Sequence, residues 1–343
     1  MEKGRVTIKD IAKALNISTS TVSRALRDHH EIKEETKNKV VELASKLDYQ
    51  PNAVSLSLLK KRTNTIGVIV PKMGYHFFSA ALEGIEATTI KAGYTVMVCQ
   101  TNESYEREVQ NIRNMAAGRV DGILVSVSGE TNKFDHFRQI QNKGIPLVFF
   151  DRECEAIQSS HVVANNYDAA SKAVEHLISR GCKKIAYLGG PQHLALSQKR
   201  LEGYKDTLLK NNLTYNPDWV THCDVSRDDA KRITLQLLEL EDMPDAIFAM
   251  SDRLATSAML VIKQKNLKIP EDIALIGFNN EPMADIVSPS LTTISQPEFE
   301  IGKKAAEILL AEINLKEGED PTFEKIVMET ELIVRESSKR KIY

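Results

Sequence analysis

The chain has 343 residues, of which 42% are hydrophobic and 27% are charged. This length predicts two or three folded units, and the composition is that of a soluble globular protein, which excludes wholesale disorder. No run approaches the ~18 uninterrupted apolar residues of a membrane span, and no apolar secretion signal follows Met1. Four well-separated cysteines without metal-ligand spacing favour reduced thiols in a cytoplasm.

The net charge of −2 conceals an uneven distribution. Residues 1–63 carry 13 Lys and Arg against 8 Asp and Glu, a net charge of +5. The other 280 residues carry 32 basic and 39 acidic side chains, a net charge of −7. A basic segment on an acidic body is expected when one small domain meets a polyanion such as nucleic acid; random surface charge is the alternative.

Residues 6–26 predict two short helices joined by a tight turn. Thr7 can cap the first helix, and its apolar residues recur with helical spacing. Asn16 tolerates the left-handed backbone of a turn, and Ser18 can cap the second helix. The inward-facing positions are Ile8, Ile11, Ala12, Leu15, Val22, Ala25 and Leu26. Two such helices form a helix-turn-helix, which places the start of its second helix in the DNA major groove.

The second predicted helix has one face of short hydroxyl side chains and a single arginine. Opposite its apolar positions lie Thr19, Ser20, Ser23 and Arg24. Short hydroxyls let a helix approach base edges and phosphates closely, and Arg24 can reach O6 and N7 of guanine. Ser- and Thr-rich helix starts are also common caps, but the ordered motif over residues 7–24 favours DNA reading.

Four motifs follow one another in the first 69 residues. They are Thr7-Ile-Lys-Asp-Ile-Ala12, Ser18-x-x-Thr-Val-Ser-Arg-Ala-Leu26, Tyr49-x-Pro-Asn-Ala53 and Arg62-Thr-x-Thr-Ile-Gly-Val-Ile69. Together they resemble the LacI/GalR family of bacterial transcriptional regulators, and the resemblance covers essentially the whole chain. It implies base contacts for Thr19, Ser20 and Arg24. It implies phosphate contacts for Thr7, Ser18, Thr21 and Ser23.

The resemblance also implies a third helix and a hinge helix. The third helix runs roughly over residues 34–47 and packs Val40, Val41, Ala44 and Leu47 against the first two. Pro51 stops this helix, and Asn52 can cap the hinge helix. The hinge helix is expected to fold on operator DNA and to insert Leu58 into the minor groove, which kinks the duplex. Ser55 and Leu56 depart from the family's usual Ala and Arg. The expected DNA-binding residues outside the helix-turn-helix are Tyr49, Asn52, Ser55 and Leu58.

From residue 65 onward, continuous apolar runs alternate with helix-like stretches. Runs such as 66–70 and 122–126 are typical of strands buried on both faces. This rhythm predicts an α/β fold with parallel sheets covered by helices. The resemblance implies, after the helical helix-turn-helix head, two doubly wound parallel α/β subdomains of the periplasmic-binding-protein-like type.

These patterns and the resemblance together predict the domain boundaries. We expect a helix-turn-helix DNA-binding domain over residues 1–50, a hinge over 51–63, and an effector-binding and dimerisation domain over 64–343. The expected N-subdomain comprises residues 64–163 and 295–323, and the expected C-subdomain comprises residues 164–292 and 324–340. The signature Leu291–Pro297 implies a crossing into the N-subdomain, and a last crossing would place residues 325–333 in the C-subdomain.

Polar side chains that follow successive predicted strands indicate a ligand site at the strands' carboxyl ends. Arg200 matches the arginine that family members aim into the cleft. The expected effector-binding residues are Phe78, Ser126, Asp151, Arg200, Trp219, Asp252 and Asn279, with Phe78 or Trp219 as an apolar wall. Asn279 replaces the Asp of many sugar-binding members, and Ala164 stands where Asp is common. A sugar derivative or a nucleoside is therefore an alternative to a plain hexose.

Other classes of function fit the sequence less well. No Gly-x-Ser-x-Gly elbow, P-loop or His-Glu-x-x-His motif is present, so we expect no enzyme, no catalytic residues, no cofactor and no metal site. A periplasmic-type sugar-binding transport protein would share the cleft, but it would have no use for the basic head. A regulator that responds to no ligand is the third alternative.

The resulting hypothesis is a cytoplasmic transcriptional regulator, expected to be a repressor. It would act as a homodimer whose two heads read a pseudo-palindromic double-stranded operator, because dimer symmetry imposes DNA symmetry. A small hydroxylated, sugar-like effector in the cleft would change the relative pose of the subdomains and so the DNA affinity. No membrane partner is expected.

Overall fold

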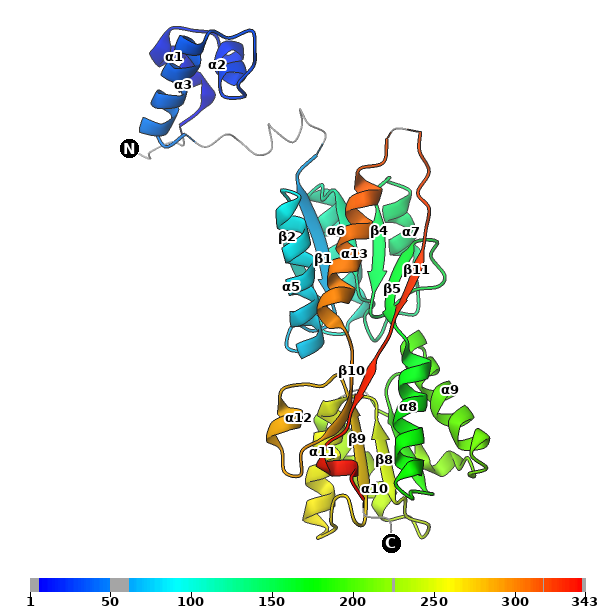
Figure 1. The fold of residues 1–343 in the computed structure, drawn as a ribbon. Coiled ribbons are helices and arrows are strands. Elements are labelled where there is room, and N and C mark those ends of the chain that lie inside the picture. The colour runs from blue at the N-terminus through cyan, green and yellow to red at the C-terminus, as the bar shows by residue number, and fades with distance from the viewer. Residues whose placement is uncertain (1–5, 50–61, 224–225, 317, 341–343) are drawn as a thin grey trace. The chain divides into compact units, whose positions relative to one another are not determined.

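The computed structural model describes residues 6–49, 62–223, 226–316 and 318–340 (Figure 1). The chain divides into two compact units, Met1–Thr63 and Asn64–Tyr343. We call the described part of the first unit up to residue 49 the head, and the described part of the second unit the body. The expected hinge contacts Asn52, Ser55 and Leu58 lie outside the described residues.

The head is a three-helix unit that contains the predicted helix-turn-helix. Its helices are α1 (Ile8–Leu15), α2 (Thr19–Ala25) and α3 (Glu34–Lys46). The carboxylate of Asp10 accepts a hydrogen bond of 2.8 Å from the backbone N–H of Thr7 and so closes the start of α1. Asn16 ends α1 with a φ of 51°, and the Ser18 hydroxyl accepts the Thr21 N–H at 3.0 Å as the cap of α2.

A small apolar core holds these three helices together. Its buried members are Ile11, Ala12, Val22, Ala25, Val40 and Ala44. Val40 and Ala44 stand one turn apart on α3 and therefore share its inner face. The prediction that Val41 and Leu47 also pack inward is wrong, because their side chains are 53% and 37% exposed. Leu43 packs against the core instead.

The first lobe of the body is a six-stranded parallel sheet between two layers of helices. The sheet has the order β11-β5-β4-β3-β1-β2. Its strands are β1 (Thr65–Val70), β2 (Thr95–Gln100), β3 (Gly122–Val125), β4 (Leu147–Phe150), β5 (Ser160–Ala164) and β11 (Lys325–Met328). Helices α5 (His76–Lys91) and α13 (Glu298–Ile313) cover one face, and α6 (Tyr105–Ala117) and α7 (Asp135–Gln141) cover the other.

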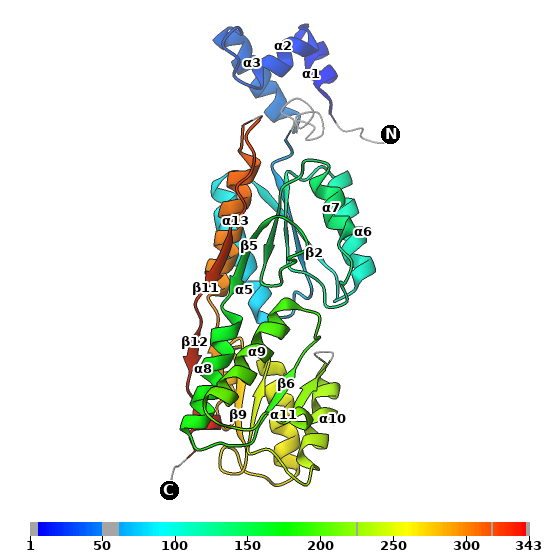
Figure 2. The same cartoon turned by 90° about the vertical axis from the view of Figure 1, so that its right-hand side faces the viewer.

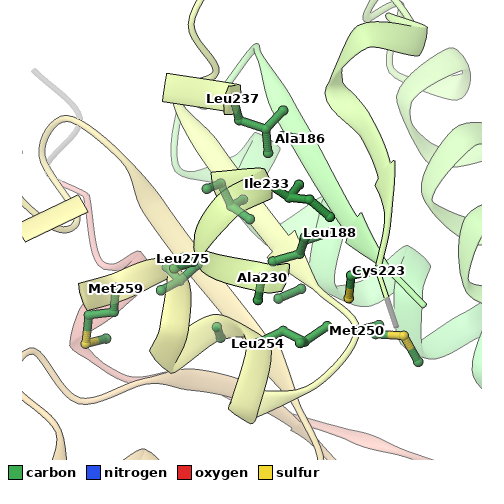
Figure 3. Packing of buried hydrophobic residues seen from close by; sticks show 14 of the residues in the cluster. Ala186, Leu188, Cys223, Ala230, Ile233, Leu237, Met250, Leu254, Met259 and Leu275 are labelled. Atoms are coloured by element: carbon green, nitrogen blue, oxygen red, sulfur yellow. The ribbon is translucent and has the colours of Figure 1, made fainter. Parts of the chain in front are cut away.

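The second lobe repeats this architecture with the order β12-β10-β9-β8-β6-β7, parallel except for the β10–β12 pair. Its strands are β6 (Ile185–Gly189), β7 (Val220–His222), β8 (Ala246–Ala249), β9 (Ala274–Phe278), β10 (Thr292–Ser295) and β12 (Glu331–Ile333). Its helices are α8 (Asn166–Ser179), α9 (Ala195–Lys210), α10 (Arg227–Leu238), α11 (Asp252–Gln264) and α12 (Met283–Ile286). Figure 3 shows how Ile233 of α10 packs beside Leu188 of β6 in one of its cores.

The chain passes between the two sheets three times, after β5, after β10 and after β11 (Figure 2). The fold therefore has the two doubly wound parallel α/β lobes that were predicted. The boundary predicted at residue 324 is wrong, because β11 pairs in parallel with β5 of the first sheet, with Ile326 opposite Val162. Only β12 belongs to the second sheet, so the last crossing lies between Met328 and Glu331.

The residues after β12 complete the second lobe. The 3-10 helix η2 (Glu336–Ser338) buries Ser337 and Ser338 completely. The Ser337 hydroxyl donates to the carbonyl of Leu275 at 2.6 Å, and the Ser338 hydroxyl lies 2.8 Å from Nε2 of His176. Residues near the end of the chain thus connect β9 and α8 of this lobe.

Candidate DNA-reading surface and effector site

The predicted DNA-reading residues that the structure describes lie along α2, at the start of α1 and just after α3. The exposed members of this set are Thr7, Ser18, Thr19, Ser20 and Arg24. The half-buried members are Thr21, Ser23 and Tyr49. The Ser18 hydroxyl lies 2.7 Å from that of Ser20 and 2.8 Å from that of Thr21. Hydroxyls both donate and accept hydrogen bonds and reorient freely, so this cluster can contact phosphate oxygens or base edges.

Arg24 is the long basic side chain of this surface, and an acidic residue holds it in the unbound head. One of its terminal guanidinium nitrogens lies 2.8 Å from the carboxylate of Glu31, and both side chains are more than half exposed. An exposed ion pair of this kind contributes only ~0–1 kcal/mol, so a guanine base can replace Glu31 as the partner of Arg24.

The body has a cavity of about 340 Å³ that residues from both lobes line. This volume lies at the lower end of the ~300–1,000 Å³ typical of small-molecule sites. The first lobe contributes Tyr75, Phe77, Phe78, Glu103, Gly129, Glu130, Asp151 and Arg152. The second lobe contributes Pro191, Leu194, Leu196, Arg200, Met250, Ser251, Arg253, Asn279 and Glu281. Apolar rings and charged groups therefore face the same space.

Arg200 is a buried polar side chain in the wall of the cavity. It is 3% exposed, and its Nε donates to Asn166 Oδ1 while Nη1 donates to the carbonyl of Met250, both at 2.8 Å. Its guanidinium carbon lies 3.5 Å from the ring centroid of Phe278. Burial lowers the pKa of Arg200 to about 10, so the side chain still carries its charge at neutral pH.

In the first lobe, the acid Asp151 and the base Arg152 follow β4, and Glu103, the ion-pair partner of Arg152, lies after β2. Asp151 has a φ of 60° and accepts a hydrogen bond of 3.2 Å from the Ser126 hydroxyl. Arg152 donates to both carboxylate oxygens of Glu103, at 2.6 and 3.1 Å. Burial raises the pKa of Asp151, although Arg152 and Arg200 oppose the effect. The carboxylate and carboxyl oxygens here can accept hydrogen bonds from ligand hydroxyls.

The strand ends of the second lobe supply an amide and a buried carboxyl. Asn279 lines the cavity, and its Oδ1 accepts a hydrogen bond of 2.8 Å from Gln296. Asp252 lies behind the lining at 1% exposure, where it accepts the Thr293 hydroxyl at 2.6 Å and the backbone N–H of Glu281 at 2.7 Å. Burial raises the pKa of Asp252 to about 7.

The predicted effector residues thus divide into three groups. The lining includes Phe78, Asp151, Arg200 and Asn279. Ser126 and Asp252 are buried behind the lining, where they hold other residues in place. Trp219 does not line the cavity; it packs in a core of the second lobe, and its indole N–H donates to the carbonyl of Asp242 at 2.9 Å. The apolar wall comes from Phe77 and Phe78.

Sequence reasoning missed several charged residues of the lining, among them Glu103, Arg253 and Glu281. Each stands two or more residues away from a strand end, within a turn or at the start of a helix. Arg152 directly follows Asp151 after β4, so its position after a predicted strand does indicate a place at the site. Residues that line the cavity are thus found not only directly after the predicted strands but also a few positions further along the chain.

Metal-binding clusters and membrane-spanning helices are both absent from the described part of the chain. No cluster of three or more His, Cys, Asp or Glu side chains within it is arranged to hold a metal ion. None of its helices combines the length and apolar character needed to cross a membrane.

Comparison with known sequences gives the family. The family of bacterial regulatory proteins called lacI matches residues 7–52, and a periplasmic binding protein-like domain matches residues 174–338. The HTH-type transcriptional repressor PurR of Vibrio campbellii is 36% identical over 334 residues, which are 97% of this chain and 99% of the relative. PurR of Vibrio vulnificus is 36% identical over 336 residues, with the same coverage. The chain belongs to the LacI family.

Solved structures agree with this assignment. A complex of the transcriptional regulator CelR with cellobiose is 26% identical, with a TM-score of 0.74 over 97% of this chain and 100% of that one. The lac repressor dimer bound to operator and an anti-inducer has a TM-score of 0.84 over 98% of this chain and 99% of that one. At 24% identity, the latter likeness concerns the fold.

Family membership determines the general activity. The chain is a DNA-binding transcriptional repressor of the LacI type and not an enzyme, because its full-length relatives are repressors and its head is the family's helix-turn-helix. The transport protein considered as an alternative is thereby set aside, since the matches extend over the head as well as the body.

Proposed function

We propose that the chain represses transcription as a homodimer on a pseudo-palindromic operator under the control of a small hydroxylated, sugar-like ligand. The observation that carries this proposal is the cavity of about 340 Å³, with the buried cation Arg200 in its wall, in a chain that also carries a helix-turn-helix. A cavity between two lobes is the usual place for a small ligand in sheets of this kind.

The roles proposed at DNA follow from the exposed face of α2. Thr19, Ser20 and Arg24 would read base edges in the major groove, because all three are exposed on α2. Thr7, Ser18, Thr21 and Ser23 would contact phosphates, together with Tyr49. In the hinge, Asn52 and Ser55 would contact DNA, and Leu58 would enter the minor groove.

The chemistry of the cavity supports a hydroxylated ligand. Phe77 and Phe78 offer apolar faces for a carbon skeleton, while Asp151, Arg200 and Asn279 offer acceptors and donors for hydroxyl groups. The CelR structure, 26% identical over the same fold, contains the disaccharide cellobiose. We therefore assign a sugar or sugar derivative to this cavity.

Exposed apolar side chains on the second lobe support a homodimer. Leu260 of α11 is 53% exposed, and Met283 and Ile286 of α12 are 47% and 74% exposed. Lys263 of α11 donates to the carbonyl of Ser288 just after α12, which joins the two elements. Exposed apolar side chains on adjoining elements are expected where a second copy covers them. The proposed site of action is the cytoplasm, where bacterial operators lie.

The proposed allosteric mechanism uses the three segments that join the lobes. A ligand with groups bound to both lobes stabilises one relative pose of the lobes over the other. In a dimer, that pose sets the spacing of the two hinge segments and so the fit of the two heads to the half-sites. The coupling is reciprocal, so operator DNA must change ligand affinity by the same factor.

Operator selection tests the proposal directly. The full-length protein is used to select binding sequences from a random duplex library, and binding is then measured by fluorescence anisotropy with and without sugars and nucleosides. We expect a two-fold symmetric site whose affinity one of these compounds changes. An asymmetric half-site, or a protein that is monomeric in light scattering, would contradict the homodimer. Leu58→Ala should reduce operator bending in a gel assay, and unaltered bending would remove the proposed insertion.

A further inference from the structure

The three arginines that line the cavity differ in whether an acidic residue neutralises them. Arg152 is paired with Glu103 through two hydrogen bonds. Arg200 and Arg253 have no carboxylate oxygen within 4.0 Å of their guanidinium nitrogens among the described residues. Two positive charges therefore border the cavity without an ion-pair partner.

Arg253 stands where the two lobes approach each other. It is the second residue of α11 in the second lobe, and its guanidinium carbon lies 4.9 Å from the ring centroid of Tyr75 in the first lobe. Its Nε is buried and donates no hydrogen bond. A buried guanidinium donor without an acceptor is costly, so this side chain is arranged to receive an acceptor that the chain itself does not provide.

The acidic residues of the cavity are poor partners for these two cations. Burial raises the pKa of Asp151 and of Glu281, whereas the nearby charges of Arg200 and Arg253, respectively, act to lower it. Glu130 accepts the backbone N–H of Tyr105 at 3.2 Å, and Glu103 is paired with Arg152. Among the described residues, no carboxylate of the cavity thus forms an ion pair with Arg200 or Arg253.

We infer that the effector is an anionic, monosaccharide-sized molecule whose acidic group, a carboxylate or a phosphate, binds the guanidinium of Arg253. The inference rests on the proposed function of this cavity as the effector site, and it specifies the ligand class. An acid bound to Arg253 would lie beside Tyr75 and so contact both lobes. The hydroxylated remainder would occupy the space between Phe78 and Arg200. A hydroxyl of a neutral sugar could accept a hydrogen bond from Arg253, but it would leave the positive charge of the guanidinium without a counter-charge.

Matched sets of ligands test this inference on the full-length protein. The first set is D-galactose, D-galacturonate and galactose 1-phosphate, and the second is D-glucose, D-glucuronate and glucose 6-phosphate. Thermal shift and calorimetric titration measure binding. We expect at least one acid to bind at least 10-fold more tightly than its neutral parent. Whether a uronate or a phosphate responds identifies the acidic group.

Variants of Arg253 connect the preference to this residue. Arg253→Gln keeps a donor but removes the charge, and it should reduce the affinity for the responding acid at least 10-fold, to about that of the neutral parent. Arg253→Lys should restore part of the loss. The matched control is Arg232→Gln on α10, whose side chain is 59% exposed and does not line the cavity. It should leave the affinity unchanged.

Three outcomes would overturn the inference. If neutral parents bind as tightly as the acids, the cavity is an effector site but not one for anions. If no compound of either set binds, the sugar-like effector proposed above fails together with the acidic one. If Arg253→Gln lowers the melting temperature without ligand by more than ~4 °C, Arg253 has a structural role as the partner of Tyr75. A smaller change is expected for a side chain without an ion pair.

Discussion

The head and the body place their polar binding groups in opposite settings. The head keeps hydroxyls and Arg24 at its surface, above a core of only six buried residues. The body encloses Arg200 and Asp151 in a cavity, between lobes with two extensive cores each. DNA is a large polyanion that brings its own charge and shape, whereas a small ligand must be surrounded before enough contacts form.

This difference predicts different sensitivities to mutation. A surface side chain contributes one contact and leaves the surrounding fold intact, so its loss should weaken recognition by a moderate factor. A buried charged side chain also organises its neighbours, because its donors already bind other parts of the wall. The following predictions test this contrast, beginning with the largest expected effect.

Arg200→Ala should abolish the response of operator binding to ligand. The variant removes a buried cation together with hydrogen bonds to Asn166 and Met250, and we expect ligand affinity to fall at least ~100-fold. Calorimetry with a responding ligand measures the loss. Operator binding without ligand should persist, because the head is a separate compact unit. A normal ligand response would place the site elsewhere.

Arg24→Ala should weaken operator binding by about 10- to 100-fold and binding to random DNA far less, because a bidentate contact to guanine carries sequence information. Anisotropy titrations with both duplexes measure the ratio. Lys39→Ala provides the control, since Lys39 is an exposed cation of α3 that pairs with Glu35. Equal losses on the two duplexes would show that Arg24 contacts phosphate alone.

Asp252→Asn should remove part of the pH dependence of stability. The pKa of Asp252 is about 7 in the folded chain, whereas its ordinary value is 3.8. Between these two pH values, the folded chain retains a proton on Asp252 that the unfolded chain releases. Stability should therefore fall as pH rises from 5 to 7, by about 1–2 kcal/mol more than in the variant. Urea unfolding at both pH values measures this difference. Asp135→Asn, at an exposed position, should retain the wild-type slope.

Glu31→Gln should strengthen DNA binding by about two- to five-fold. Glu31 holds Arg24 in the unbound head and adds a negative charge near the DNA phosphates, so its neutralisation frees the arginine. The same anisotropy assay applies, with Glu42→Gln on α3 as the matched control. Unchanged or weaker binding would show that Glu31 does not compete with DNA for Arg24.

The strands and the head were predictable because their signals are local. Apolar runs such as 66–70 must be buried on both faces, and caps such as Ser18 act within a single turn. The sheet to which β11 belongs was not predictable in this way. Its alternating pattern fits an edge strand of either sheet, and its partner β5 lies some 160 residues earlier.

The candidate site was predictable only in part for the same reason. Asp151 and Asn279 follow strands directly, so their place at the strand ends could be inferred. The prediction that Trp219 forms an apolar wall of the cavity is wrong, because its side chain packs in a core and its N–H donates to the carbonyl of Asp242. Asp242 lies 23 residues further along the chain, so no pattern near Trp219 indicates this contact. Arg253 emerges as a candidate only when Tyr75 is brought beside it by the fold.

The dependence of the second lobe on β12 and η2 affects the order in which the protein can fold during synthesis. The head lies within the first 49 residues and can fold while the rest is still being translated. The second lobe must wait for residues 331–338, because Ser337 and Ser338 fill its interior. During translation, the DNA-binding head can therefore be folded well before the ligand-responsive part of the same chain is complete.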